Sequence, residues 1–329
     1  MEARDCHVEF GVLVRLSRFD AELQRPSVVA FGVFDGLHLG HQAIIAEVVR
    51  LAHEHAASAS VITFDPHPAL VLSPDTAPRL IGTLPQRLEG LERLGIEQVG
   101  VLGFDELSAR ETATSFVERV LVGRLGVADL VVGDDVHFGR DREGDIELLV
   151  REGANHGFRV HTSPTYGGDE RFSSTAVRSC VATGDVEGAR AILGHPFVLR
   201  GVVVHGDSRG REMGFPTANL RVAEHQLLPA LGIYAAAVHL ADGRWLCGAV
   251  SVGTRPQFYE NGGVLVEVHL PNFQGDLYDQ VLDVAFLAHL RGERTFATLE
   301  DLLAQMARDV EQSCDIFEEF NPGATLLLG

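Results

Sequence analysis

At 329 residues the chain is longer than one average domain and can bury two hydrophobic cores. Its formal net charge of −19 disfavours binding to nucleic acid, which usually requires a basic surface. The 27 residues counted as lysine or arginine are all arginine. Mechanisms that depend on lysine, such as a Walker A phosphate loop or a pyridoxal Schiff base, are therefore excluded.

The sequence predicts a cytoplasmic protein that does not cross a membrane. No uninterrupted apolar stretch approaches the roughly 20 residues that a bilayer-spanning helix needs, and the opening residues MEARDCHVEF have no signal-peptide core. The four cysteines Cys6, Cys180, Cys247 and Cys314 lie far apart along the chain. This spacing is typical neither of a zinc site nor of a disulfide framework, so we expect reduced and mostly buried thiols.

In the first half of the chain, short apolar runs alternate with amphipathic segments. The strand candidates read SVVAFGVF, ASVITF, EQVGVLGF and ADLVVG, and the helix candidates lie at 39–56, 85–94 and 111–125. Such alternation predicts an α/β domain in which helices wrap a parallel sheet.

Two short helices are expected next, at 174–183 and 186–193, and the stretch GHPFVLRG after them is predicted to cross between two domains. Residues 198–288 then supply strand candidates separated by turn residues, which predicts an antiparallel β-barrel. We place the domain boundary between residues 186 and 187.

A single amphipathic helix is expected to close the second domain. Thr298 is its predicted N-cap. Helical spacing puts a set of apolar side chains on one face, namely Leu299, Leu302, Leu303, Met306, Val310 and Phe317.

Two histidines three residues apart stand out in the stretch VVAFGVFDGLHLGH. His38 and His41 fall where a strand ends and a helix begins, which is where open α/β sheets bind phosphates. At this spacing two imidazoles on one helix share a face and can donate to the same phosphate chain. The glycines at 32, 36 and 40 are spaced by four, so they do not form the dinucleotide fingerprint of dehydrogenases. The alternative is that the two histidines only cap an ordinary first helix.

The segment GVFDGLHLGH resembles the H-x-G-H signature of the nucleotidyltransferase superfamily. Together with FDPHP (64–68), GDDVHFG (133–139) and SSTAVR (173–178), it makes the chain resemble the prokaryotic bifunctional riboflavin kinase and FAD synthetase family over nearly its full length. The resemblance implies a Rossmann-like FMN adenylyltransferase domain at 1–186 and a riboflavin kinase domain at 187–329. It also implies ATP as co-substrate, Mg²⁺ as cofactor, and riboflavin, FMN and FAD as the remaining partners.

The resemblance assigns roles in the adenylyltransferase half. His38, His41 and Arg178 would act on the phosphates of ATP. Further ATP-binding positions would be Gly32, Phe34, Asp35, Gly36, Ser173, Ser174 and Thr175. The flavin side would be formed by Asp65, Pro66, His67, Asp135 and Phe138. Val136 stands where the family has an aromatic residue, and taken alone the PHP stretch is also compatible with a rigid loop.

In the kinase half, GVVVHGDSRGREMGFPTANL (201–220) resembles the family's glycine-rich loop that leads into P-T-A-N. This implies ATP binding by Gly206, Arg209 and Gly214. It implies Mg²⁺ binding by Thr217 and Asn219, whose side-chain oxygens suit that ion.

The strand VLVEVHL carries the predicted general base. Its alternation puts Glu267 on the face opposite Val266 and Val268. The resemblance makes Glu267 the base for the 5′-hydroxyl of riboflavin, a role that a carboxylate takes in other kinases; otherwise it is an ordinary solvated glutamate. VGTRPQF (252–258) resembles a flavin-contacting loop through Arg255. Ser251 and Gln257 replace the more usual asparagine and threonine.

Two alternatives to a bifunctional enzyme remain at this point. One is an adenylyltransferase with an inactive kinase half, and the other is a flavin-binding protein without catalysis. An aminoacyl-tRNA synthetase also uses an H-x-G-H pair, but the acidic charge and the absence of lysine oppose it. The sequence makes no prediction of the oligomeric state.

Overall fold

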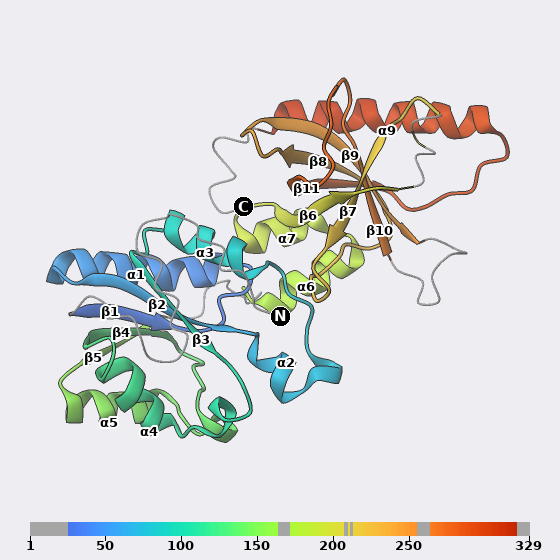
Figure 1. Cartoon of the computed structure of the whole chain (residues 1–329). Coiled ribbons are helices and arrows are strands. Elements are labelled where there is room, and N and C mark those ends of the chain that lie inside the picture. Colours follow the sequence, from blue (N-terminus) through green and yellow to red (C-terminus); the bar gives the residue numbers. More distant parts are fainter. Residues whose placement is uncertain (1–25, 164–171, 207–209, 211–212, 255–263, 321–329) are drawn as a thin grey trace. The chain divides into compact units, whose positions relative to one another are not determined.

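The computed structural model describes residues 26–163, 172–206, 210, 213–254 and 264–320 (Figure 1). The chain divides into two compact units, each built from several segments. The first unit takes Met1–Phe34, Gly40–Pro78 and Leu91–Gly168. The second takes Asp35–Leu39, Arg79–Gly90 and Asp169–Gly329.

The first unit contains a parallel five-stranded sheet, which confirms the predicted α/β fold. Its strands are β1 (Ser27–Phe31), β2 (Ser58–Asp65), β3 (Gln98–Gly103), β4 (Val127–Gly133) and β5 (Arg159–Ser163), in the order β3-β2-β1-β4-β5. Every neighbouring pair is parallel. The strand β5 was not among the strand candidates, because its short RVHTS run carries no apolar signal. The strand β1 ends at Phe31, three residues before the predicted end.

The helices of the first half are α1 (Leu39–His55), α2 (Pro68–Leu72), α3 (Leu84–Arg93), α4 (Ala113–Phe116) and α5 (Ile146–His156). The positions of α1 and α3 agree with the predicted helices at 39–56 and 85–94, whereas α2 and α5 were not among the helix candidates. The predicted helix at 111–125 is shorter, since α4 is capped by Thr112 and passes into a π-helical stretch, η3 (Val117–Val122). Short 3₁₀ turns lie at η1 (Pro74–Thr76), η2 (Ser108–Arg110) and η4 (Arg140–Arg142).

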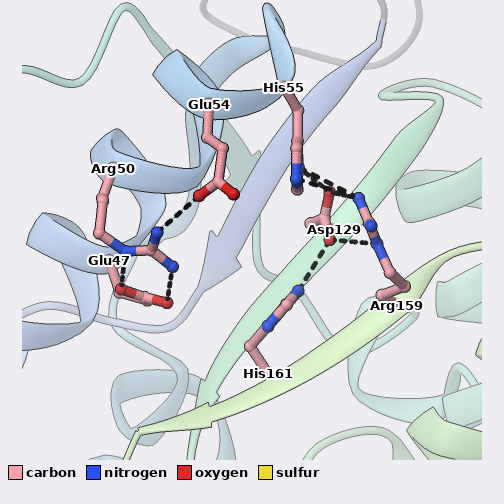
Figure 2. Close-up of polar contacts among 7 residues, drawn as sticks. All are labelled: Glu47, Arg50, Glu54, His55, Asp129, Arg159 and His161. Atoms are coloured by element: carbon pink, nitrogen blue, oxygen red, sulfur yellow. Dashed lines mark hydrogen bonds and ion pairs between the residues drawn. The ribbon is translucent and has the colours of Figure 1, made fainter.

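A buried carboxylate ties three elements of the first unit together (Figure 2). The Asp129 side chain on β4 is fully buried, and both of its oxygens accept hydrogen bonds. Arg159 of β5 approaches from Nε and Nη2, each at 2.8 Å. His161 Nε2 of β5 donates at 2.7 Å and His55 Nδ1, at the end of α1, at 2.8 Å. Burial opposes ionisation of Asp129, but these donors outweigh it and lower the pKa of the carboxyl.

The second unit contains a closed antiparallel barrel, as predicted. Its strands are β6 (Phe197–Val204), β7 (Thr217–Val222), β8 (Gly232–His239), β9 (Trp245–Thr254), β10 (Val264–His269) and β11 (Val281–Arg291), in the order β10-β7-β6-β11-β8-β9. The prediction that GHPFVLRG only crosses between domains was wrong. Phe197 and Leu199 are fully buried at alternate positions of β6, so this stretch already belongs to the barrel wall.

Among the described residues that follow β5, the second unit contains the helices α6 (Ser174–Thr183), α7 (Val186–Leu193) and α9 (Leu299–Glu319). The predicted positions of α6 and α7 are confirmed. Thr298 is the N-cap of α9, as expected, and accepts a hydrogen bond from Asp301 N. Phe320, which directly follows α9, is buried in an apolar cluster with residues of the barrel and of α9. The guanidinium of Arg190 on α7 lies over the Phe320 ring.

The packed face of α9 agrees with the predicted apolar face except at Leu299, which is 55% exposed; the other five predicted residues are half-buried. Two polar residues that were not predicted to be buried, Asp309 and Ser313, also lie on the buried side. Arg291 of β11 binds both oxygens of Asp309, with Nη2 at 2.7 Å. Because this ion pair compensates the carboxylate for its lost hydration, a charged residue occupies a position where periodicity alone favours an apolar one.

In the described part of the chain, none of the helices has both the length and the apolar character needed to span a bilayer. Cys180, Cys247 and Cys314 are not in disulfides and are half-buried, while Cys6 lies outside the described residues.

Candidate functional sites

The loop that follows β1 lies at the switch point of the parallel sheet. The sheet order runs from β1 to β2 on one side and from β1 to β4 on the other, which is the position where doubly wound sheets bind ligands. The loop turns sharply, with positive φ at Phe34 (54°), Gly36 (80°) and Leu37 (44°). Two of these residues carry side chains, and such backbone outliers cluster at ligand sites.

This loop delivers the two histidines to the start of α1. His41 lies in the first turn of α1, and its ring packs edge-on against Phe34, with ring centroids 5.2 Å apart. His38 directly precedes the first helical residue and is 7% exposed, so the expectation that both histidines lie on the helix holds only for His41. The first turn of α1 contains no acidic residue. A helix N-terminus with this composition favours anions.

Asp35 is the centre of a polar cluster within the second unit. Its carboxylate is buried and accepts hydrogen bonds from the backbone of Ile81, at 3.0 Å to Oδ2, and of Gly82, at 3.1 Å to Oδ1. Arg178 Nη2 donates to Oδ2 at 2.6 Å. Ser174 Oγ donates to the Asp35 carbonyl at 2.9 Å. The structure therefore brings together three of the predicted site residues: Asp35, Ser174 and Arg178.

Arg178 is held from two sides. Besides the bond to Asp35, its Nε donates to the Arg79 carbonyl at 2.7 Å, and 17% of the side chain is exposed. The hydrogen bonds that hold Arg178 use Nε and Nη2. Ser173 caps α6 by accepting from Ala176 N, and Thr175 in the first turn is exposed.

The predicted flavin-side residues lie at the end of β2 or follow β2 and β4 in the first unit. Because neighbouring parallel strands end at the same edge of a sheet, the segments of Asp65 and Asp135 start from one edge. His67 is the N-cap of α2, and its Nδ1 accepts from Ala69 N at 3.0 Å, which leaves the proton of a neutral ring on Nε2. Phe138 packs edge-on against Phe31, with centroids 5.1 Å apart, and so also supports the core. The Asp65–Pro66 peptide bond is cis.

In the barrel, the predicted kinase residues meet on two adjacent strands. β7 pairs with β10 so that Asn219 lies opposite Glu267 and Thr217 opposite His269. Thr217 Oγ1 donates to Glu267 Oε1 at 3.3 Å. As predicted, Glu267 is on the face of β10 opposite the buried Val266 and Val268.

Asn219 has an unsatisfied acceptor at this place. The residue is 6% exposed, and its Oδ1 has no hydrogen-bond partner among the described residues. Gly206 lies directly against the same amide, since a Cβ at position 206 would be 2.1 Å from Asn219 Nδ2. An orphaned amide oxygen beside a hydroxyl and a carboxylate fits the oxygen ligands of Mg²⁺.

The structure describes little of the other predicted positions of the kinase half. Gly214 adopts a left-handed backbone with φ of 83°. Arg209, Arg255 and Gln257 lie outside the described residues. No group of three or more His, Cys, Asp and Glu able to hold a metal ion occurs in the described ranges.

Sequence reasoning missed two features of these sites. The Ile81 and Gly82 amides that bind Asp35 are backbone groups, and no residue type marks them in the sequence. His195 was read only as part of a crossing segment, yet it lines a small pocket with Gly36 and Leu37 in the second unit. Its Nδ1 lies 2.8 Å from the Pro196 carbonyl, and burial lowers the pKa of the ring.

A switch-point loop suited to phosphates and a barrel site suited to Mg²⁺ and a hydroxyl substrate define a class of protein: a two-domain, nucleotide-dependent transferase of phosphorus-containing groups. The family model described as FAD synthetase matches residues 20–176, and the model described as riboflavin kinase matches residues 193–317. The chain belongs to the family of bifunctional riboflavin kinases and FMN adenylyltransferases.

Similar curated proteins carry the name bifunctional riboflavin kinase/FMN adenylyltransferase. The protein of Pseudomonas fluorescens is 40% identical over 87% of this chain and 91% of its own length. That of Escherichia coli K12 is 38% identical, also over 87% of this chain and 91% of its own length. That of Bacillus subtilis is 32% identical over 90% of this chain and 94% of its own length.

A solved structure from Streptococcus pneumoniae, titled as a macrolide-efflux protein, has a similar fold. It shares 30% identity with a TM-score of 0.78, and the match covers 87% of this chain and 93% of that chain.

Proposed function

We propose that this chain makes FAD from riboflavin in two ATP-dependent steps at two separate sites. Residues 187–329 transfer the γ-phosphoryl group of ATP to riboflavin, giving FMN and ADP. Residues 1–186 transfer the adenylyl group of a second ATP to FMN, giving FAD and pyrophosphate. The observation that carries the proposal is the pairing of Glu267 with Thr217 and Asn219 in a barrel that is joined to a phosphate-type α/β loop.

In the adenylyl step, an oxygen of the FMN phosphate attacks the α-phosphorus of ATP, and the bond to the bridging oxygen of pyrophosphate breaks. The protein's task is to align the two phosphates and to stabilise the growing negative charge. We assign this task to His38, to His41 and to the N-terminus of α1, with donors directed at the phosphate oxygens.

Arg178 supplies a further positive charge to the leaving phosphates. Its Nε and Nη2 are used to hold the side chain, so Nη1 is the group left to bind substrate. Asp35 is then a positioning residue, because its oxygens serve Arg178 and the backbone of 81–82. Gly32, Phe34 and Gly36 shape the loop, and Ser173 and Ser174 fix the start of α6. We assign the exposed Thr175 to ATP binding as well.

On the flavin side of the adenylyl site we place Asp65, Pro66, His67, Asp135 and Phe138. His67 is oriented at the start of α2, because its Nδ1 accepts a hydrogen bond from Ala69 N. The packing of Phe138 against Phe31 gives the flavin side a rigid wall.

In the kinase step, Glu267 removes the proton from the 5′-hydroxyl of riboflavin as the oxygen attacks the γ-phosphorus. Thr217 orients this carboxylate through its hydrogen bond to Oε1. The side-chain oxygens Thr217 Oγ1 and Asn219 Oδ1 would hold Mg²⁺. When bound, the ion would neutralise charge on the ATP phosphates. Gly206, Arg209 and Gly214 contact ATP, and Arg255 contacts the flavin. We retain the sequence-based prediction of a cytoplasmic location for this synthesis.

The two sites can be separated by their products. His41→Ala should leave FMN formation intact and let FMN accumulate from riboflavin and Mg·ATP. Glu267→Gln should abolish FMN formation, by about 10²- to 10⁴-fold for a lost general base, while added FMN is still converted to FAD. Each variant must first show the parent thermal midpoint.

Three results would contradict the proposal. If Glu267→Gln phosphorylates riboflavin at the parent rate, the assigned base is wrong. If His41→Ala makes FAD from FMN normally, the histidines only cap α1. If the parent protein binds FMN but forms no product from either substrate, the chain is a flavin-binding protein.

A further inference from the structure

Two cysteines that are distant in the sequence meet in the second unit. Cys247 lies on β9 and Cys314 on α9, 67 residues further along the chain, and their sulfur atoms are 2.9 Å apart. Both thiols are half-buried and are not joined in a disulfide. Neither belongs to the kinase or the adenylyltransferase site described above.

The surrounding structure holds this pair in register. Cys247 is paired across the sheet with Ala237 of β8, a fully buried residue of the wall that α9 covers. Ile316 and Phe317, which follow Cys314 on α9, pack against the same cluster. The Arg291–Asp309 ion pair fixes α9 one turn earlier. Because these contacts place the helix independently of the thiols, the short sulfur–sulfur distance is a property of the fold.

We propose that Cys247 and Cys314 form an oxidative modification site, here called the thiol pair. Its reactant is a low-molecular-weight disulfide such as oxidised glutathione. Its product is an intramolecular disulfide that fastens α9 to β9.

The chemistry proceeds by two exchange steps. The Cys314 thiolate attacks one sulfur of the small disulfide, which forms a mixed disulfide and releases the first small thiolate. Cys247 then loses its proton and attacks Cys314 Sγ, which forms the protein disulfide and releases the second. The two protein thiols lose two electrons and two protons in total, and the small disulfide becomes two small thiols.

The environment of Cys247 decides the order of these steps. Burial raises the pKa of the Cys247 thiol, and the neighbouring Cys314 and Glu318 raise it further. Cys247 therefore stays protonated at neutral pH, and we assign the first attack to Cys314. Once the mixed disulfide is formed on Cys314, proximity makes Cys247 effective.

The test uses the full-length protein with Cys6→Ser and Cys180→Ser, so that only the thiol pair remains. After incubation with excess oxidised glutathione, the intact mass should fall by two hydrogen atoms. Proteolysis without reductant should give one peptide linking β9 to α9. The linkage closes a long loop in the unfolded chain, so the thermal midpoint should rise by at least about 5 °C and return after reduction.

Cys247→Ser and Cys314→Ser, each in the same background, are the matched controls. Each should keep the reduced protein's midpoint, and Cys314→Ser should react more slowly with glutathione than Cys247→Ser. The proposal is overturned if the parent background gains glutathione on both cysteines without the linked peptide. It is equally overturned if the disulfide forms but lowers the thermal midpoint, because the folded structure would then have to distort to form the bond.

Discussion

Asn219 shows how a proposed metal ligand can be unfavourable for the folded protein. Its buried Oδ1 lacks a hydrogen-bond partner among the described residues, and an unsatisfied buried acceptor costs about 1–3 kcal/mol. The proposed Mg²⁺-binding role explains why such an atom is tolerated, since binding sites often carry strain that binding relieves.

We therefore expect Asn219→Ala to separate stability from activity. Riboflavin phosphorylation should need at least about 10-fold more Mg²⁺, in line with what ligand-shell changes cost. The thermal midpoint should stay level or rise, because the unsatisfied oxygen is gone. Conversion of FMN to FAD is the internal control. An unchanged Mg²⁺ titration of the kinase step would remove Asn219 from the metal site.

Asp35 and Arg178 offer a test of positioning against direct binding. If Asp35 acts on ATP only through Arg178, then Asp35→Asn and Arg178→Met should each slow FAD formation, and the double variant should be no slower than Arg178→Met alone. The kinase activity of each variant reports whether the fold survives. If the two losses multiply in kcat/KM for ATP, Asp35 contacts the nucleotide itself.

The sequence predicted much of these sites, because their side chains stand in dense motifs. It placed Thr217, Asn219 and Glu267 in one site, and strand pairing confirms that they are neighbours. It could not predict that Asp35 is bound by backbone amides of 81–82, since such donors have no residue signature. The roles of His38, His41 and the flavin-side residues stay predictions until the variants are assayed.

At the scale of elements, the Asp129 cluster explains how a sheet edge can be polar and still ordered (Figure 2). The strand β5 has no apolar run, so periodicity missed it. It is held beside β4 by Arg159 and His161, which share one buried carboxylate with His55 of α1. On α9, periodicity identified most of the packed apolar residues but could not predict Asp309, which is buried in an ion pair.

Asp129→Asn should therefore make the free energy of unfolding less dependent on pH in the acidic range. The pKa of Asp129 is lower in the folded than in the unfolded chain, so the unfolded state binds more protons as pH falls. This contribution is complete above pH of about 5 and is lost as pH falls through the folded pKa. We expect the variant to be about 2–4 kcal/mol less stable at pH 7 and the difference to shrink below pH of about 4.

Urea titrations from pH 7 to pH 3 would check this expectation. Glu47→Gln, on the exposed Arg50 network of α1, is a suitable control, since exposed ion pairs contribute little. Parallel pH profiles of the parent and Asp129→Asn would contradict the role given to the buried carboxylate.

At the scale of the whole molecule, the compact units do not follow the chain in two simple blocks. The sequence suggested a division between 186 and 187, which we retain as the proposed boundary between the two activities. The second compact unit nevertheless includes α6, which precedes that boundary. Val177 and Val181 of α6 are fully buried in one core with Leu193 of α7 and Phe197 of the barrel.

This packing leads to a prediction about where the barrel can be separated from the rest. A fragment 187–329 lacks α6, whereas a fragment 172–329 keeps it together with its Ser173 cap. Burial of two valine side chains contributes about 3–6 kcal/mol, so the longer fragment should be more stable by roughly that amount. Trp245 is the single tryptophan of the chain and lies on β9, so its fluorescence reports unfolding of the barrel alone.

In the full-length protein, Val181→Ala should lower the urea midpoint of the Trp245 transition, while the exposed-site variant Thr175→Ala should not. Equal midpoints for the two fragments, together with an unchanged midpoint for Val181→Ala, would mean that α6 packs on the barrel without stabilising it.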